Sequence, residues 1–372
     1  MKKIVIISKS IDGGTGTFVI NLLNIKKLLG KNYSIKVCIF EKPNFRNVKD
    51  YKFVFLHNKS FYPNKYSLIN SFRYFMNDLF KLKEIINTDS PDLIISVNYY
   101  TNILVALGKM FFLIKEKAIL TYHNNFLVIL RKRCSSIVRI LSGLIFPHIF
   151  KSTVNVSVSK SLSKELETFM NLSKVRIIPN GVNIKPSNKK SKNNPHGKII
   201  SIGRFDEQKD YFTLLNAFAI LNKKIRTSQM MLIGDGKDYK KILQHIKKLK
   251  LGSSIRLLKW QNNIGKFLKK SDVFIFSSNY EGFPYVIIEA MSYGLPVIST
   301  DTPYGPGEIL DNGKYGYLVT MKNDIKMAKY MYDLLTNKKK YRYFSLKSLE
   351  RVKYFSLSKM LEAYIKLIKK VI

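Results

Sequence analysis

The chain has 372 residues, 46% of them hydrophobic and 13% aromatic, which suffices for two domains of ordinary size and excludes a disordered chain. Its net charge of +39 favours polyanionic partners such as nucleic acid, anionic lipid or phosphorylated small molecules, although a codon bias towards Lys, Asn and Ile would explain part of it. The two cysteines, Cys38 and Cys134, form no Cys-x-x-Cys pair, which argues against a structural zinc or a disulfide framework.

The first half of the sequence predicts strands that alternate with helices. Residues 3–7 indicate a buried strand, because the apolar run is too short for the core of a signal peptide. A glycine-rich turn is expected at 13–16, followed by a helix that reaches Gly30. Apolar residues at helical spacing predict another helix across 68–80. Further strands are expected at 35–40, 93–97, 118–122 and 154–158.

The second half repeats this plan after a polar segment, 185–197, with the composition of a linker. Strands are expected at 198–202, 230–233, 254–258, 273–277 and 296–299, with helices at 211–221 and 237–249. This alternation predicts an α/β fold made of two Rossmann-like, doubly wound domains. The expected limits are 1–183 for the N-terminal domain and 184–354 for the C-terminal domain, with a last basic helix at 355–372 that packs back on the first domain.

Two acids with seven residues between them, Glu281 and Glu289, form the sharpest motif. They follow the strand expected at 273–277, and a helix is expected to begin near Tyr285. Ligands of open α/β sheets bind beyond the carboxyl ends of strands, and a helix N-terminus favours a phosphate. The segment therefore indicates a ligand site, although an ordinary strand, loop and helix with a solvated glutamate would carry the same residues.

Arg204 and Lys209 follow the strand expected at 198–202, where two cations would stabilise a leaving diphosphate. Plain surface charge is the alternative in so basic a chain. Gly13, Gly14 and Gly16 would let a phosphate or sugar approach the backbone closely. They do not form the G-x-G-x-x-G fingerprint of dinucleotide binding, so a tight turn is the alternative and a nicotinamide dehydrogenase is disfavoured.

Taken together, the motifs resemble those of the retaining glycosyltransferases of family four, which have the GT-B fold of two domains facing across a cleft. The resemblance covers nearly the whole chain and is best over 197–320. It is carried by "ISIGRFDEQKDYFTLLNAF", "MLIGDGKDY", "WQNNIGKFLKKSDVFIFSSNYEGFPYVIIEAMSYGLPVISTDTPYGPGEIL" and "YGYLV". This chain has Asp210 at a position where the family commonly has glycine, which leaves details of donor binding open.

The resemblance implies a role for each matching position. Arg204 and Lys209 would neutralise the donor diphosphate, Glu289 would bind the ribose, and Glu281 would hold the transferred sugar. His123 matches a histidine that lines the sugar site, with a buried structural histidine as the alternative. The implied catalytic residues are Glu281, His123, Arg204 and Lys209, and the implied donor contacts are Gly13, Gly14, Arg204, Lys209, Gly282, Phe283, Pro284 and Glu289.

The implied reaction moves a hexose or N-acetylhexosamine from a nucleoside-diphosphate sugar, with retention at the anomeric carbon. No cofactor and no metal are expected, because no D-x-D motif lies in a suitable loop. The segment "DTPYGPGEIL" favours UDP over GDP as the nucleotide. A rival interpretation is a sugar-nucleotide epimerase on the same fold. A nucleic-acid-binding protein is disfavoured, because the basic residues are dispersed and no known motif appears.

The acceptor is expected on the first domain. A basic cluster lies between two apolar runs there, as in a helix face that rests on anionic lipid, although core packing with solvated charge would give the same pattern. Its members are Arg131, Lys132, Arg133 and Arg139. We therefore expect a lipid-linked or membrane-associated saccharide acceptor in surface polysaccharide or lipopolysaccharide synthesis, and a cytoplasmic protein peripheral on the inner face of the cell membrane.

Overall fold

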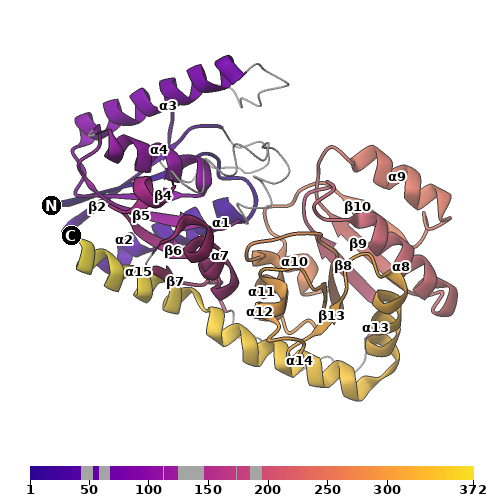
Figure 1. Cartoon of the computed structure of the whole chain (residues 1–372). Coiled ribbons are helices and arrows are strands. Elements are labelled where there is room, and N and C mark those ends of the chain that lie inside the picture. The colour runs from indigo at the N-terminus through magenta and orange to yellow at the C-terminus, as the bar shows by residue number, and fades with distance from the viewer. Residues whose placement is uncertain (43–52, 58–67, 112, 125–145, 173, 185–194) are drawn as a thin grey trace. The chain divides into compact units, whose positions relative to one another are not determined.

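The computed structural model describes residues 1–42, 53–57, 68–111, 113–124, 146–172, 174–184 and 195–372 (Figure 1). The chain divides into two compact units, one of Met1–Pro179 with Met360–Ile372 and one of Asn180–Lys359. The domain limits drawn from the sequence, at 183/184 and 354/355, stay a prediction. Among the described residues, no helix combines the length and the apolar character that crossing a membrane requires.

In its described residues, the first unit contains a parallel sheet of seven strands in the order β3-β2-β1-β4-β5-β6-β7. Strand β4 is buried at all five positions, as expected where helices cover both faces of a sheet. The strands are β1 (Lys2–Ser8), β2 (Tyr33–Ile39), β3 (Phe53–Phe55), β4 (Leu93–Val97), β5 (Lys117–Tyr122), β6 (Val154–Ser157) and β7 (Val175–Ile177).

The described part of the second unit contains a parallel sheet of six strands in the order β10-β9-β8-β11-β12-β13. In each sheet the first three strands are added in one direction from the first strand, and the later strands are added on its other side. This is the doubly wound Rossmann arrangement. The predicted fold class is confirmed. The strands are β8 (Lys198–Ile202), β9 (Gln229–Ile233), β10 (Ile255–Leu258), β11 (Val273–Phe276), β12 (Val297–Thr300) and β13 (Tyr317–Val319).

Helices connect the strands of both sheets. Those of the first half are α1 (Gly13–Leu23), α2 (Ile25–Leu29), α3 (Leu68–Asp89), α4 (Tyr99–Met110) and α7 (Lys160–Met170). Those of the second half are α8 (Tyr211–Lys224), α9 (Tyr239–Lys248), α10 (Gly265–Leu268), α11 (Tyr285–Ser292), α12 (Pro306–Ile309), α13 (Asp324–Thr336), α14 (Lys338–Val352), the 3₁₀ turn η1 (Lys353–Phe355) and α15 (Leu357–Val371). From Met360 onwards α15 belongs to the first unit, where the buried Tyr364 lies 5.7 Å from Phe18 of α1, ring centre to ring centre.

The glycine-rich turn expected at 13–16 is wrong, because these residues form the first turn of α1. Gly14 and Gly16 each cost the helix up to about 1 kcal/mol relative to alanine, whereas Gly13, with φ +63°, has a backbone conformation that favours glycine. Phe18, Val19 and Leu22 are almost fully buried on the same helix, and each contributes roughly 1.5–3 kcal/mol. Their burial outweighs the cost of the glycines. The helix also stops short of Gly30, because α1 ends at Leu23 and α2 follows as a separate short helix.

Candidate functional site

The loop between β8 and α8 holds Arg204 and Lys209 at the carboxyl edge of the second sheet. Its last residue, Asp210, has φ +42°, in the left-handed region that favours glycine but that aspartate tolerates. The Asp210 carboxylate accepts hydrogen bonds from the Thr213 backbone nitrogen at 3.4 Å and the Thr213 hydroxyl at 2.7 Å. Asp210 therefore caps the N-terminus of α8.

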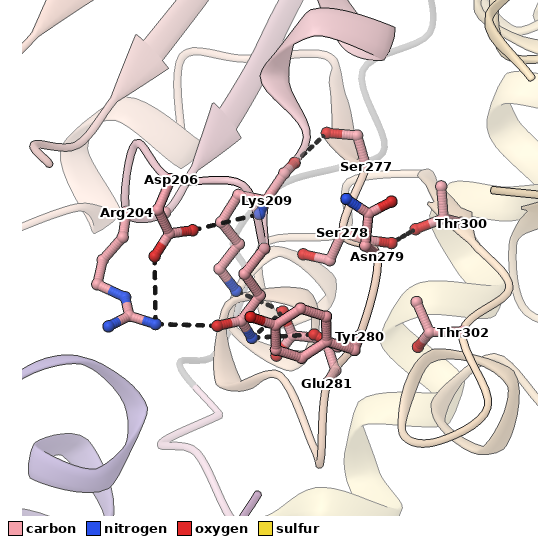
Figure 2. Close-up of polar contacts among 12 residues, drawn as sticks. Arg204, Asp206, Lys209, Ser277, Ser278, Asn279, Tyr280, Glu281, Thr300 and Thr302 are labelled. Carbon is pink, nitrogen blue, oxygen red and sulfur yellow. Dashed lines mark hydrogen bonds and ion pairs between the residues drawn. The ribbon is translucent and has the colours of Figure 1, made fainter. Parts of the chain in front are cut away.

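A second loop, between β11 and α11, lies beside the first and carries Glu281 (Figure 2). The Ser277 hydroxyl donates to the Lys209 carbonyl at 2.7 Å. The Asn279 backbone nitrogen donates to the Gln208 carbonyl, also at 2.7 Å. Strands β8 and β11 are neighbours at the point where the strand order reverses, which is where ligands of such sheets bind.

Lys209 and Glu281 form an ion pair at the centre of this edge. The Lys209 ammonium lies 2.5 Å from Oε1 of Glu281, and their side chains are 15% and 8% exposed. The ammonium also lies 4.7 Å from the centre of the Phe276 ring, which adds a cation–π contact. A lysine ammonium has three N–H donors, so the pair leaves it donors for a further anion.

Gln208 joins this ion pair to Arg204. Its amide nitrogen donates to the Tyr280 carbonyl at 2.9 Å and to Oε1 of Glu281 at 3.2 Å. Its amide oxygen accepts from Nη2 of Arg204 at 2.9 Å. The guanidinium of Arg204 also lies 3.4 Å from Asp206, and its side chain is 50% exposed. The structure thus brings Arg204, Lys209 and Glu281 into one connected network.

Gln208 was not among the residues selected from the sequence. The sequence did carry a signal, because Gln208 lies between Arg204 and Lys209. A side-chain amide there can accept a hydrogen bond from one cation and donate one to the carboxylate that pairs with the other cation. Its partners Tyr280 and Glu281 lie more than 70 positions away, so the sequence alone could not identify them.

The segment from Gly282 to Pro284 leads into α11. Pro284 occupies the N-cap position of α11 and makes no side-chain capping hydrogen bond. Phe283 is buried, with its ring centre 5.3 Å from that of Phe355, and its carbonyl accepts from Asn180 at 3.4 Å. Glu289 is half-buried on α11.

The other predicted residues lie in the first unit. Gly13 and Gly14 begin α1 directly after the β1 loop, and Gly13 has φ +63°. His123 follows β5, is 5% exposed, and lies 4.1 Å from Phe18 of the same helix, ring centre to ring centre. Its Nε2 is 3.1 Å from the Thr121 hydroxyl. The histidine thus contacts α1, the helix that the two glycines begin, at the carboxyl edge of the first sheet.

Two further expectations concern the basic cluster of the first domain and a bound metal. The basic cluster of Arg131, Lys132, Arg133 and Arg139 lies outside the described residues. Among the residues that are described, no three His, Cys, Asp or Glu side chains gather in a way that could hold a metal ion.

Comparison with known proteins identifies the family of the chain. The family described as Glycosyl transferases group 1 matches residues 183–351, and Glycosyltransferase Family 4 matches residues 13–185. An uncharacterized glycosyltransferase of Methanocaldococcus jannaschii is 31% identical over 306 residues, which cover 77% of this chain and 73% of that one. The N-acetylgalactosamine-N,N'-diacetylbacillosaminyl-diphospho-undecaprenol 4-alpha-N-acetylgalactosaminyltransferase of Campylobacter jejuni is 31% identical over 141 residues, 38% of each chain.

Solved structures share the fold at low sequence identity. Sucrose-phosphate synthase from Thermosynechococcus elongatus superimposes with a TM-score of 0.81 at 18% identity, over 100% of this chain and 99% of that one. The Anabaena protein HepE, solved in complex with UDP, gives a TM-score of 0.74 at 17% identity over 100% of both chains. The sequence matches place the activity in glycan synthesis and do not favour an epimerase. The chain belongs to the family-4 glycosyltransferases of the GT-B fold.

Proposed function

We propose that this glycosyltransferase moves a hexose or N-acetylhexosamine from a UDP-sugar, with retention and without a metal, to a saccharide or lipid-linked acceptor at the inner face of the cell membrane. The observation that carries the proposal is the network of Arg204, Gln208, Lys209 and Glu281 at the carboxyl edge of β8 and β11. A pair of cations held beside a carboxylate suits a diphosphate that is attached to a sugar.

Arg204 and Lys209 would act on the leaving group. When the bond between the anomeric carbon and the diphosphate oxygen breaks, the electron pair stays with that oxygen. The half-exposed guanidinium of Arg204 and the remaining N–H donors of Lys209 would stabilise the new charge. Both cations are already held by Gln208 and Glu281, so little reorganisation is needed as the charge develops. Two fixed cations would supply the neutralisation for which other transferases use a metal.

The remaining residues would position the donor. Glu281 and the backbone N–H groups of Gly282 and Phe283 would hold the transferred sugar, while Pro284 has no N–H and would only direct the chain into α11. The N-terminus of α11, with its positive dipole end, would favour a phosphate, and Glu289 would bind the ribose hydroxyls. In the first unit, Gly13 and Gly14 would meet the phosphate, and His123 would line the sugar site.

The donor and the acceptor are proposed from the sequence and from relatives. UDP is favoured by the segment 301–310 and by the UDP held in the HepE structure. A lipid-linked acceptor is favoured by the Campylobacter relative, whose name describes a diphospho-undecaprenol substrate. The basic cluster at 131–139 would rest on the membrane.

The test begins with thermal unfolding of the purified chain against UDP-, GDP- and ADP-sugars, because a bound donor stabilises the native state by mass action. We expect UDP-sugars to raise the unfolding temperature most. The stabilising donor is then incubated with acceptor in EDTA, and proton NMR reports the anomeric configuration of the product. An inverted product, or activity that EDTA abolishes and metal restores, would contradict the proposed mechanism.

A further inference from the structure

Helix α14 and the turn η1 that follows it present a row of exposed side chains on one face. Counted from Lys339, these residues lie at i+3, i+4, i+7, i+14 and i+15, and residues at this spacing lie on the same side of a helix. The opposite side of α14 is buried against the second unit through residues such as Tyr341 and Phe344. The row, called here the basic–aromatic row, consists of Lys339, Arg342, Tyr343, Leu346, Lys353 and Tyr354.

The apolar members of the row are unusually exposed. Tyr343 and Leu346 are each 51% exposed, and Tyr354 is 60% exposed. Single exposed apolar residues are common on protein surfaces and need no explanation. Three on one helical face, alternating with cations, are typical of helices that lie in the boundary between water and lipid.

The net charge of this face is positive, because its one acid, the exposed Glu350 at i+4 from Leu346, is paired with Lys347. Helix α14, KKKYRYFSLKSLERV, contains six basic residues and one acid, Glu350. The Glu350 carboxylate accepts from the Lys347 ammonium at 2.7 Å and from the Tyr315 hydroxyl at 3.1 Å, and these bonds lower its pKa. Within the described residues, no acid lies within ion-pair distance of Lys339, Arg342 or Lys353.

The end of the row is held rigidly. Arg351 donates to the carbonyls of Glu308 and Ile309, each at 2.8 Å. Its guanidinium lies 5.1 Å from the centre of the Tyr354 ring, and the Lys359 ammonium lies 5.4 Å from the same ring. A side chain that is already ordered loses less conformational entropy on binding, so the row is pre-organised for a partner.

We propose that the basic–aromatic row docks the second unit on an anionic membrane surface. Its three cations would lie among anionic lipid headgroups, while Tyr343, Leu346 and Tyr354 would enter the boundary with the acyl chains. Charge complementarity selects an anionic partner, and the aliphatic Leu346 between two tyrosines favours lipid over the stacked bases of a nucleic acid. This surface is distinct from the basic cluster at 131–139, and the proposal does not depend on the donor or the acceptor.

The chain provides a matched control on α9. Lys240, Lys247 and Lys248 are exposed in the same unit, but the one large apolar side chain exposed among the residues of α9 is Leu243, at 39%. Replacing these three lysines by glutamine removes the same charge from the protein. The variant therefore measures how much of the binding comes from the attraction of net positive charge to anionic vesicles. The experiment is co-sedimentation of the full chain with vesicles of phosphatidylglycerol and phosphatidylcholine, or of phosphatidylcholine alone, without nucleotide.

Each basic residue near an anionic surface contributes roughly fivefold in affinity, so Lys339→Gln, Arg342→Gln and Lys353→Gln together should weaken binding about 100-fold. The α9 triple variant should lose far less. Tyr343→Ser, Leu346→Ser and Tyr354→Ser together should weaken binding while its salt dependence is kept. Unfolding temperatures close to that of the wild type would show that each variant is folded.

Three results would overturn the proposal. One is equal binding of the wild type to anionic and neutral vesicles. Another is equal weakening by the α9 and α14 charge variants, which would mean that only net charge matters. The third is tighter, salt-resistant binding to single-stranded RNA than to anionic vesicles, lost in the same α14 variants, which would assign the row to nucleic acid.

Discussion

The buried ion pair of Lys209 and Glu281 makes a prediction that separates stability from catalysis. Lys209→Met keeps the length of the side chain but leaves the Glu281 carboxylate, 8% exposed, without its ammonium. Breaking a buried pair by removing one partner costs about 3–5 kcal/mol. Gln208 would still donate to Glu281 at 3.2 Å, so we expect a loss near the lower end, about 3 kcal/mol.

The chain contains its own probe for this measurement. Trp260 is the single tryptophan and lies in the second unit, so its fluorescence reports the unfolding of that unit. With a urea m-value of about 2 kcal/mol/M, a loss of about 3 kcal/mol lowers the midpoint by about 1.5 M.

The double variant Lys209→Met with Glu281→Gln supplies the control, because it removes both charges at once. We expect it to unfold within about 1 kcal/mol of the wild type, since an uncharged pair leaves no carboxylate to desolvate. It should nevertheless stay inactive, because the cation for the diphosphate is missing. Equal midpoints for the single and double variants would refute the reasoning that an unpaired buried carboxylate causes the loss.

Variants at Gln208, Gly234 and Cys38 test other contacts of the fold and the site. Gln208→Ala should lower turnover roughly 10- to 100-fold without a comparable loss of stability, because the amide that positions the cation and carboxylate is removed; initial-rate kinetics test this. A Cβ on Gly234 would lie 1.9 Å from a carbonyl oxygen, so Gly234→Ala should cost at least about 1–3 kcal/mol by Trp fluorescence, whereas Gly252→Ala, with nothing within 4 Å, should be nearly neutral. Burial raises the pKa of Cys38 to about 11, so in a Cys134→Ser background Cys38 should react with a disulfide reagent at pH 8 only when the chain unfolds; because the folded pKa exceeds the unfolded one, the protein should also lose stability as pH rises above about 9, and rapid labelling of the native chain would contradict both expectations.

The sequence predicted the two sheets well wherever strands are continuous apolar runs. The strand expected at 93–97 is β4, and that expected at 198–202 is β8, with identical limits. The edge strands β3, β7 and β13 were missed, because three residues carry no measurable periodicity and their pairing partners come from elsewhere in the chain. Local patterns therefore identify the centre of each sheet better than its edges.

The sequence predicted residues of the candidate site but not the network that joins three of them. The strings around Arg204, Lys209 and Glu281 identified the loops, because the chemistry of a diphosphate requires cations at strand ends. The ion pair at 2.5 Å and the bridging role of Gln208 depend on how the two loops pack, which no local pattern records. Asp210 is a related case. The sequence shows only that aspartate stands where the resemblance leads one to expect glycine, whereas the structure shows that this residue has a positive φ.

Arg204 is proposed to stabilise the diphosphate as it leaves, and the turnover of a single variant measures that contribution. Arg204→Ala is compared with Arg226→Ala, an exposed arginine between α8 and β9 of the same unit, using the donor that binds the wild type. Loss of one such electrostatic donor typically costs about 10²–10³ in rate, so we expect that loss for Arg204→Ala, unchanged turnover for Arg226→Ala, and wild-type unfolding of both. Near-normal turnover of Arg204→Ala at saturating donor would contradict the account.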